Sequence, residues 1–344
     1  MNSSDDALRG CLTGLRVLDL TRLLPGPLAA RHLADWGAEV TKIDEPGAGE
    51  PARVLLQSAE DRAAGRDSAF YRELNRNKRE LRIDLRSDAG RAQLLARVDE
   101  SDALLEGFRP GVMARLGLGW ETLHARNPRL VMASISGYGQ RGAYAQRAGH
   151  DINYIAMSGV LGQIGTADGE LVLPNFQIAD LLGGTLAATA ALLAALLGAQ
   201  RSGQGRHLDV SMAHEVWRHA IIPRAERTPA TAAGPAATLL NGGAACYGVY
   251  RAACGRHLAV GALEPKFWRA FCAAISRPEW GDRHWSCGEA PGSAAASATR
   301  ADVAALLATR SVDDWLKRTD PADCCVTAVL RVDEVEAHPW FDRG

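Results

Sequence analysis

The sequence predicts an α/β protein in which a large, doubly wound domain is followed by a smaller α+β domain. Short apolar segments alternate with helical stretches through the first part of the chain, which is the pattern of a parallel sheet covered by helices. The chain also opens with a βαβ unit. Its 344 residues exceed the length of about 250 to 300 residues at which one core usually splits into two domains.

The opening βαβ unit predicts a parallel sheet with a right-handed crossover. Residues 15–21 (LRVLDLT) are expected to form a short buried strand, and a Pro-Gly-Pro turn then leads into a helix over residues 28–36. Gly37 is expected to end this helix, and residues 39–44 (EVTKID) form the next strand.

The same alternation continues beyond this unit. Further strands are expected over residues 81–85, 103–106 and 130–136, and the helical stretches between them include residues 88–98. Together these elements predict a Rossmann-like first domain over residues 1–223.

One apolar segment has the length of a membrane span. Residues 181–200 (LLGGTLAATAALLAALLGAQ) carry no charge and reach the roughly 20 residues that a spanning helix needs. Their apolarity is mostly alanine, with glycine and threonine interspersed, and small residues let other helices approach closely. We therefore expect a helix in the protein core and no membrane partner.

The second part of the chain has a different pattern. Residues 224–240 are rich in Ala, Pro and Thr and are expected to form a linker, and a small α+β domain is expected over residues 241–322. Its expected elements are a hairpin of strands over 246–251 and 257–262, a helix over 266–275, a low-complexity patch over 288–299 and a helix over 300–308.

Charge and cysteine content exclude several classes of function. The chain has 39 basic and 40 acidic residues and a net charge of -1, so neither nucleic acid nor an anionic membrane is an expected partner. Most of the cations are arginines, whose planar fork suits phosphate groups. The 7 cysteines have no CxxC spacing, which indicates reduced thiols in a cytoplasmic protein rather than a disulfide scaffold or a zinc site.

Two motif-like segments are interpreted as structural. Residues 137–142 (GYGQRG) match GxGxxG, but the residues that follow have no apolar helical stripe, so no dinucleotide is expected there. Residues 214–219 (HEVWRH) place two histidines five positions apart, about 140° around a helix, so no metal site is expected.

Three short motifs pair an ionisable residue with glycine or proline: GHDINY with His150, ADLLGG with Asp180, and GALEP with Glu264. The residues by themselves do not unite these motifs. Taken alone, His150 would be structural, Asp180 would be an N-cap before an apolar helix, and Glu264 would be a surface acid or a cap.

The chain resembles the family III CoA-transferase (CaiB/BaiF-like) superfamily, and most closely its α-methylacyl-CoA racemase branch. The resemblance is carried by these three motifs and by the segments LRVLDLTRLLPGP, GAEVTKIDEP, LNRNKRELRIDLRS, LLEGFRPGVMARLGLG and SISGYGQRG. The resemblance runs from about residue 15 to the C-terminus. It implies an interlocked homodimer whose active site lies between the large domain of one subunit and the small domain of the other. It also implies that residues 323–344 form a return segment, shortened relative to the family.

The resemblance implies a catalytic set of His150, Asp180 and Glu264. Inverting a carbon next to a thioester needs proton removal from one face and proton delivery to the other, which His150 and Asp180 would carry out as two flanking acid/base groups. Glu264 would orient the imidazole and stabilise its charged form. The backbone N–H of Asp151, presented by the turn at Gly149, would stabilise the enolate oxygen.

The implied substrate is an acyl-CoA, specifically a 2-methylacyl-CoA thioester, with no separate cofactor and no metal. The phosphates of CoA call for arginine side chains or helix N-termini. The resemblance assigns this role to Arg109 and Arg115, with Arg86 as a further candidate.

Two other functions stay open. In a CoA-transferase, Asp180 would instead be a nucleophile that passes through an acyl anhydride and an enzyme-bound CoA thioester. The presence of His150 and Glu264 favours the racemase, because 1,1-proton transfer needs a second base. The third alternative is a CoA-binding protein without activity. Three departures from the family pattern motivate it. The C-terminal end is short, and Glu45 stands where close relatives can have an arginine near the adenine of CoA. Asn241 takes the place of an acidic residue.

Overall fold

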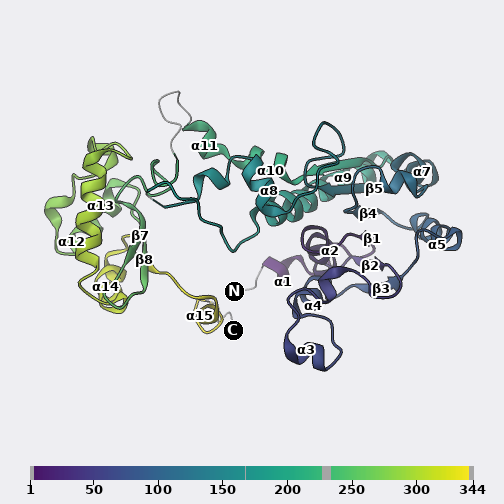
Figure 1. Cartoon of the computed structure of the whole chain (residues 1–344), viewed down its shortest axis with the longest axis horizontal. Helices are drawn as coiled ribbons and strands as arrows, with labels where there is room; N and C mark the ends of the chain where they lie inside the picture. Colours follow the sequence, from purple (N-terminus) through teal and green to yellow (C-terminus); the bar gives the residue numbers. More distant parts are fainter. Residues whose placement is uncertain (1–3, 167, 227–233, 341–344) are drawn as a thin grey trace. The chain divides into compact units, whose positions relative to one another are not determined.

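The computed structural model describes residues 4–166, 168–226 and 234–340 (Figure 1). The chain divides into two compact units: unit 1 comprises Met1–Val160 and Asn175–Ala220, and unit 2 comprises Leu161–Pro174 and Ile221–Gly344. The sequence-based boundaries differ from this division, because residues 161–174 and 221–223 belong to unit 2 rather than to the first unit. The described residues of the expected linker belong to unit 2 as well. Residues 227–233 of the expected linker and residues 341–344 of the expected return segment lie outside the described residues.

Unit 1 is built on a six-stranded parallel sheet, of which Figure 1 labels β1 to β5. Its strands are β1 (Arg16–Leu20), β2 (Glu39–Asp44), β3 (Arg79–Arg82), β4 (Ala103–Glu106), β5 (Val131–Ser136) and β6 (His207–Ser211). Their order is β3-β2-β1-β4-β5-β6, and every neighbouring pair is parallel. The prediction of a doubly wound α/β domain is confirmed. The order reverses between β1 and β4, the kind of switch point at which open α/β sheets bind ligands.

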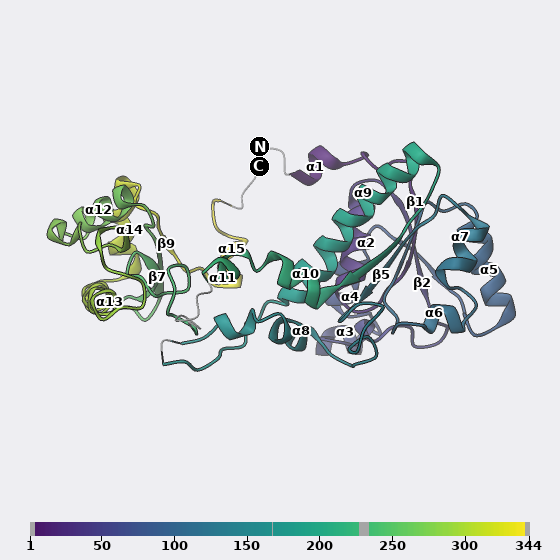
Figure 2. The same cartoon turned by 90° about the horizontal axis from the view of Figure 1, so that it is seen from above.

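Helices cover both faces of this sheet, with α2 and α9 on one face and α5 and α7 on the other (Figure 2). The helices of unit 1 are α1 (Ser4–Leu8), α2 (Pro25–Asp35), the 3₁₀ turn η1 (Pro51–Arg53), α3 (Ala59–Ala63), α4 (Ala69–Asn75), α5 (Asp88–Val98), α6 (Val112–Arg115), α7 (Trp120–Arg126), α8 (Asp151–Met157), the π-helix η3 (Ala179–Leu186), α9 (Ala187–Ser202) and α10 (Met212–His219). Leu94 of α5 and Leu123 of α7 pack in one buried cluster with Leu104 of β4, which joins that helical layer to the sheet.

The apolar segment forms one continuous helix, in which η3 is followed by α9. By length and composition alone, residues 179–202 could cross a membrane, and this is the one such helix in the described part of the chain. The helix instead packs on β5, β6 and α2. A Cβ at Gly183 or Gly184 would lie 2.5 Å from the backbone of Met212 or from the side chain of Pro25, so both glycines are needed for close packing. This packing agrees with the predicted core helix.

Unit 2 contains a three-stranded antiparallel sheet, β7 (Tyr247–Arg251), β8 (His257–Gly261) and β9 (Val326–Ala328), in the order β7-β8-β9. Its helices are the short 3₁₀ turns η2 (Leu161–Gln163), η4 (Pro278–Trp280), η5 (Trp285–Cys287) and η6 (Asp320–Ala322), and α11 (Ile221–Ala225), α12 (Pro265–Ala274), α13 (Ala294–Leu307), α14 (Val312–Thr319) and α15 (Val332–Val335). Trp268, Phe271 and Trp315 are at most 1% exposed and lie in one hydrophobic cluster. The α+β character predicted for the small domain is confirmed.

Three elements differ clearly from their expected boundaries. Helix α2 begins at Pro25 instead of residue 28, because the Pro-Gly-Pro segment that was expected to be a turn forms its first helical turn. Strand β3 covers residues 79–82 rather than 81–85; it lies at the edge of the sheet and is mostly exposed, so the apolar pattern did not mark it. Helix α13 begins at Ala294 instead of Arg300, because the Ser293 hydroxyl caps its first turn by accepting the N–H of Ala296. The alanines of the low-complexity patch are strong helix formers and continue the helix.

Candidate active site

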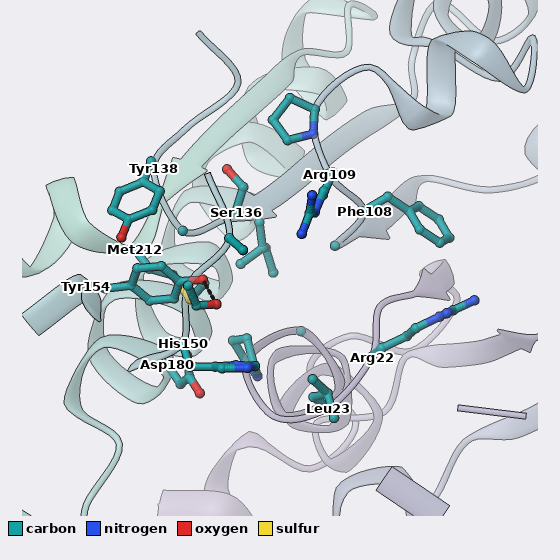
Figure 3. A pocket seen from close by; sticks show the side chains of 18 of the residues that line it. Arg22, Leu23, Phe108, Arg109, Ser136, Tyr138, His150, Tyr154, Asp180 and Met212 are labelled. Atoms are coloured by element: carbon teal, nitrogen blue, oxygen red, sulfur yellow. Dashed lines mark hydrogen bonds between the residues drawn. The ribbon is translucent and has the colours of Figure 1, made fainter. Parts of the chain in front are cut away.

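A cavity of about 510 Å³ lies at the carboxyl edge of the parallel sheet, beside the switch point between β1 and β4 (Figure 3). The loops that follow β1, β4 and β5 line one part of it, and the segment around the start of α8 and the first turn of η3 line another. His150 and Asp180 both face this cavity. The structure therefore brings the two predicted acid/base groups into one site, and Figure 3 shows them on the same side of it.

The Tyr154 ring lies so close to two glycines that line the cavity that neither position has room for a side chain. A Cβ at Gly137 would lie 2.2 Å from this ring, and one at Gly149 would lie 2.8 Å from it. The Tyr154 hydroxyl donates a hydrogen bond to the carbonyl of Gly149. The first glycine of GYGQRG is thus required for packing. No helix begins at the end of that motif, and the next one, α8, begins at Asp151.

His150 immediately precedes α8 in an extended backbone conformation. Its N–H donates to Oδ1 of Asn153 over 3.0 Å, which fixes the backbone at the start of the helix. The His150 side chain is exposed to the cavity. Asp151 is the first residue of α8, so its N–H is one of the first-turn donors that have no acceptor within the helix. Its role towards an enolate oxygen stays a prediction.

The carboxylate of Asp151 joins the start of α8 to the start of η3. Its Oδ1 accepts the N–H groups of Ala179 at 2.6 Å and of Asp180 at 3.0 Å. Asp151 therefore satisfies the first-turn donors of η3, whereas the side chain of Asp180 makes no cap of its own. The interpretation of Asp180 as an N-cap is wrong. Because one carboxylate links the two segments, the positions of His150 and Asp180 depend on each other.

The environment of Asp180 raises its proton affinity. Burial, followed by the negative charge of Asp151, raises the pKa of Asp180 to about 7. A carboxyl group that titrates near neutral pH can accept a proton and also release one. The adjacent Tyr154 stays a neutral phenol, because burial and the charge of Asp180 raise its pKa to about 12.

The three predicted CoA-binding arginines lie in different places. Arg109 lines the first cavity. Arg86 lines a second cavity of about 330 Å³, where its guanidinium lies 3.4 Å from the carboxylate of Glu45. Arg115 is exposed at the end of α6 and lines neither of these two cavities.

Glu264 belongs to unit 2, where it immediately precedes α12. Its carbonyl accepts the N–H groups of Phe267 and Trp268, both at 3.0 Å, and its side chain is exposed. The indole N–H of Trp285 donates to the carbonyl of Leu263 over 3.0 Å and holds the preceding loop. The pairing of Glu264 with His150 of unit 1 stays a prediction.

Sequence reasoning missed a group of buried charges behind the turn that follows β1. The side chains of Lys42 and Lys78 are each 1% exposed, and those of Glu50 and Asp19 are 0% exposed. Lys42 Nζ lies 2.9 Å from Glu50 Oε1, and Lys78 Nζ lies 2.8 Å from Asp19 Oδ2. A charged residue in the middle of a strand that is predicted to lie inside a covered parallel sheet, such as Asp19 in LRVLDLT or Lys42 in EVTKID, is the signal that could have found them.

Glu106 is a second missed carboxyl group at the carboxyl end of a strand. It ends β4 and is 3% exposed, and burial raises its pKa to about 7. Its Oε2 accepts the N–H of Phe108 over 2.8 Å. Glu106 thereby shapes the loop that carries Phe108 and Arg109 to the edge of the cavity.

Comparisons with known proteins agree with this architecture. Over 329 residues, the chain is 34% identical to human α-methylacyl-CoA racemase, covering 95% of this chain and 80% of that protein. Over 270 residues, it is 37% identical to the succinyl-CoA–D-citramalate CoA-transferase of Chloroflexus aurantiacus, covering 78% of this chain and 65% of that protein. The crystal structure of Rv3272 from Mycobacterium tuberculosis superimposes with a TM-score of 0.79 at 28% identity, covering 96% of this chain and 86% of that one.

The sequence model of CoA-transferase family III matches residues 12–344. The family that the sequence motifs resembled is therefore confirmed. The chain belongs to CoA-transferase family III.

Proposed function

We propose that this protein is an α-methylacyl-CoA racemase, which inverts the α-carbon of 2-methylacyl-CoA thioesters by transferring a proton between two bases. The observation that carries the proposal is that His150 and Asp180 line one cavity, where the pKa of Asp180 is raised to about 7. An acyl chain placed between two such groups can lose its α-proton to one of them and receive a proton from the other.

The proposed reaction is balanced within the site. One side chain of the pair takes the α-proton, and the electron pair of the broken C–H bond moves into the thioester carbonyl to give an enolate. The other side chain then delivers its proton to the opposite face, and the carbonyl re-forms. The N–H of Asp151 would donate to the enolate oxygen. Each turnover exchanges the protonation states of His150 and Asp180. Before the next turnover in the same direction, both side chains must therefore exchange protons with solvent.

The rest of the proposed site follows the family resemblance. Arg109 and Arg86 would bind phosphate groups of CoA, since each lines one of the two cavities. The protein would act as an interlocked homodimer, in which Glu264 of a small domain orients His150 in a large one. No separate cofactor is required, because the thioester itself acidifies the α-carbon.

Exchange of the α-proton with solvent tests the proposal. In deuterated buffer, the protein should replace the α-hydrogen of a 2-methylacyl-CoA by deuterium without any acid acceptor, and chiral analysis should show both epimers. Mass spectrometry of the recovered thioester measures the exchange.

His150→Gln should reduce that exchange by about 10²- to 10⁴-fold, because it removes one of the two acid/base groups. CoA binding should change little. His214→Gln, on the exposed part of α10, is the matched histidine control and should exchange as the unmodified protein does. Unchanged exchange in His150→Gln would remove this residue from the mechanism.

The two adjacent carboxylates give a pH prediction. Asp151→Asn keeps an oxygen acceptor for the N–H groups of Ala179 and Asp180 but removes the negative charge that helps to raise the pKa of Asp180. In the direction in which Asp180 is the base, the acid limb of kcat against pH should therefore move to lower pH. The limb should still lie above the ordinary pKa range of an aspartate, because burial is the larger cause of the raised pKa of Asp180 and is unchanged in this variant.

Asp88→Asn provides a control for this pH profile. Asp88 lies at the start of α5 with an exposed carboxylate, so its removal should leave the acid limb in place. If the limb also stays in place in Asp151→Asn, the two carboxylates are not coupled.

A CoA-transferase is the second candidate, and the 37% identity to the Chloroflexus aurantiacus transferase favours it. Asp180 would then attack the acyl group instead of its α-hydrogen. Transfer of CoA to a free carboxylic acid without deuterium incorporation would establish the transferase. Binding of CoA with neither reaction would establish a CoA-binding protein without activity.

A further inference from the structure

Arg22 occupies the junction between the two cavities. It lines both of them, as does Phe108. Its guanidinium lies over the Phe108 ring, 5.4 Å from the ring centre, which holds a cation at the wall that the two cavities share. Figure 3 shows Arg22 and Phe108 together, across the site from His150 and Asp180.

The backbone on both sides of Arg22 is anchored by the buried charges. The N–H of Thr21 donates to Oδ1 of Asp19 over 2.9 Å, and the ammonium of Lys42 donates to the carbonyl of Thr21. On the other side, the N–H of Leu23 donates to Oε2 of Glu50 over 2.6 Å. Arg22 is thus held between two residues whose polar backbone groups are bound by charged side chains.

This anchoring maintains an unfavourable backbone conformation. Leu23 has φ +64°, in the left-handed region that a branched side chain rarely adopts. Just beyond the turn, Lys78 Nζ donates to the carbonyl of Pro27, in the first turn of α2, over 2.8 Å. Strain of this kind persists where the surrounding contacts over-determine the backbone, and it is concentrated at functional sites. The side chain that this turn presents at the junction is Arg22.

We infer that Arg22 binds the diphosphate of the CoA thioester, midway between the reacting acyl group in the first cavity and the nucleotide end in the second. This inference rests on the proposed function, because it takes an acyl-CoA as the ligand. An extended ligand that reaches from His150 and Asp180 into the second cavity must pass Arg22 at the junction.

The charges around Arg22 are consistent with an incoming anion. Its nearest carboxylate, Glu45, lies 3.7 Å away, and both side chains are more than a third exposed. Such a pair contributes little in water. Glu45 is also shared with Arg86, at 3.4 Å. A diphosphate carries two charges and has the geometry for paired N–H donors, so it displaces Glu45 from Arg22.

Binding of three ligands to Arg22→Gln tests this inference. CoA and 3′-dephospho-CoA both contain the diphosphate, whereas pantetheine has no phosphate. Loss of one charge-assisted phosphate contact should weaken CoA and 3′-dephospho-CoA equally, by about tenfold, and leave pantetheine unchanged. Titration calorimetry or ligand-observed NMR measures the three dissociation constants.

Arg16→Gln is the matched control, because Arg16 is a half-exposed arginine at the amino end of β1, the strand that precedes Arg22. It should leave all three dissociation constants unchanged. Equal weakening of all three ligands in Arg22→Gln, weakening of CoA alone, or no weakening would overturn the inference while the proposed function stands. If the unmodified protein binds none of the three ligands, the proposed function fails together with the inference.

Discussion

Replacing Asp180 by asparagine is expected to reduce epimerisation and α-proton exchange by about 10³-fold or more, because the substitution removes one of the two groups that exchange a proton with the substrate. The amide has nearly the shape of the carboxyl group, so the cavity and the η3 helix should be preserved. CoA should bind with an affinity within about threefold of that of the unmodified protein. Stopped or continuous assays of deuterium incorporation, together with CoA titration, measure the two effects separately.

The same variant has a predicted effect on stability with a definite sign. The pKa of Asp180 is raised from 3.8 to about 7 in the folded protein, so between these values the folded state binds more protons than the unfolded state. Stability is therefore lost as the pH rises through this window. An asparagine side chain has no such titration, so Asp180→Asn should unfold at a higher temperature than the unmodified protein at pH 8 and show a smaller difference at pH 4.

Asp88→Asn controls for the loss of a carboxylate, because the Asp88 side chain is 97% exposed. It should leave activity unchanged. Full activity in Asp180→Asn would refute both the racemase and the transferase mechanisms, since each needs this carboxylate. Reduced stability of Asp180→Asn at pH 8 would instead show that burial of the carboxylate does not oppose folding.

The strands β2 and β4 and the helix α5 have the expected residues, for different reasons. β4 is buried along its whole length, and the buried residues of α5 recur every fourth position on one face. β2 follows the glycine that ends α2 and completes the βαβ unit. The edge strand β3 was misplaced because most of it is exposed, and the start of α13 was misplaced because alanine occupies both its buried and its exposed positions there. The family motifs supplied what periodicity does not, namely that His150 and Asp180 belong to one site.

Contacts between distant side chains were beyond prediction. In sequence, Asp151 is a neighbour of His150, and nothing there indicates that its carboxylate caps a helix 28 residues later. Arg22 resembles an ordinary loop residue in the sequence, because its position at the junction depends on where β1 and β4 end. Lysine is normally a surface residue, so Lys42 and Lys78 gave no sign of burial except that Lys42 lies inside a predicted strand.

The largest effect on stability is expected for Lys78→Met, which should lower the free energy of unfolding by about 3 to 5 kcal/mol. The Lys78 ammonium is buried and donates to Asp19 at 2.8 Å, to the carbonyl of Pro27 at 2.8 Å and to Oδ1 of Asn75 at 2.9 Å. Methionine fills a similar volume but leaves three acceptors without this donor, one of them a fully buried carboxylate. The loss is measured by urea-induced unfolding, from the transition in which unit 1 unfolds.

Two further variants separate the charge pair from the packing. Lys317→Met removes a lysine that is 78% exposed and should cost less than about 1 kcal/mol. Lys78→Met combined with Asp19→Asn removes both charges, so it should be more stable than Lys78→Met alone. If the buried charges serve to hold the turn that carries Arg22, the double variant will still bind CoA more weakly than the unmodified protein, because the carbonyl of Pro27 has lost its donor in both. Full recovery of CoA affinity in the double variant would mean that the pair stabilises the fold without positioning the turn.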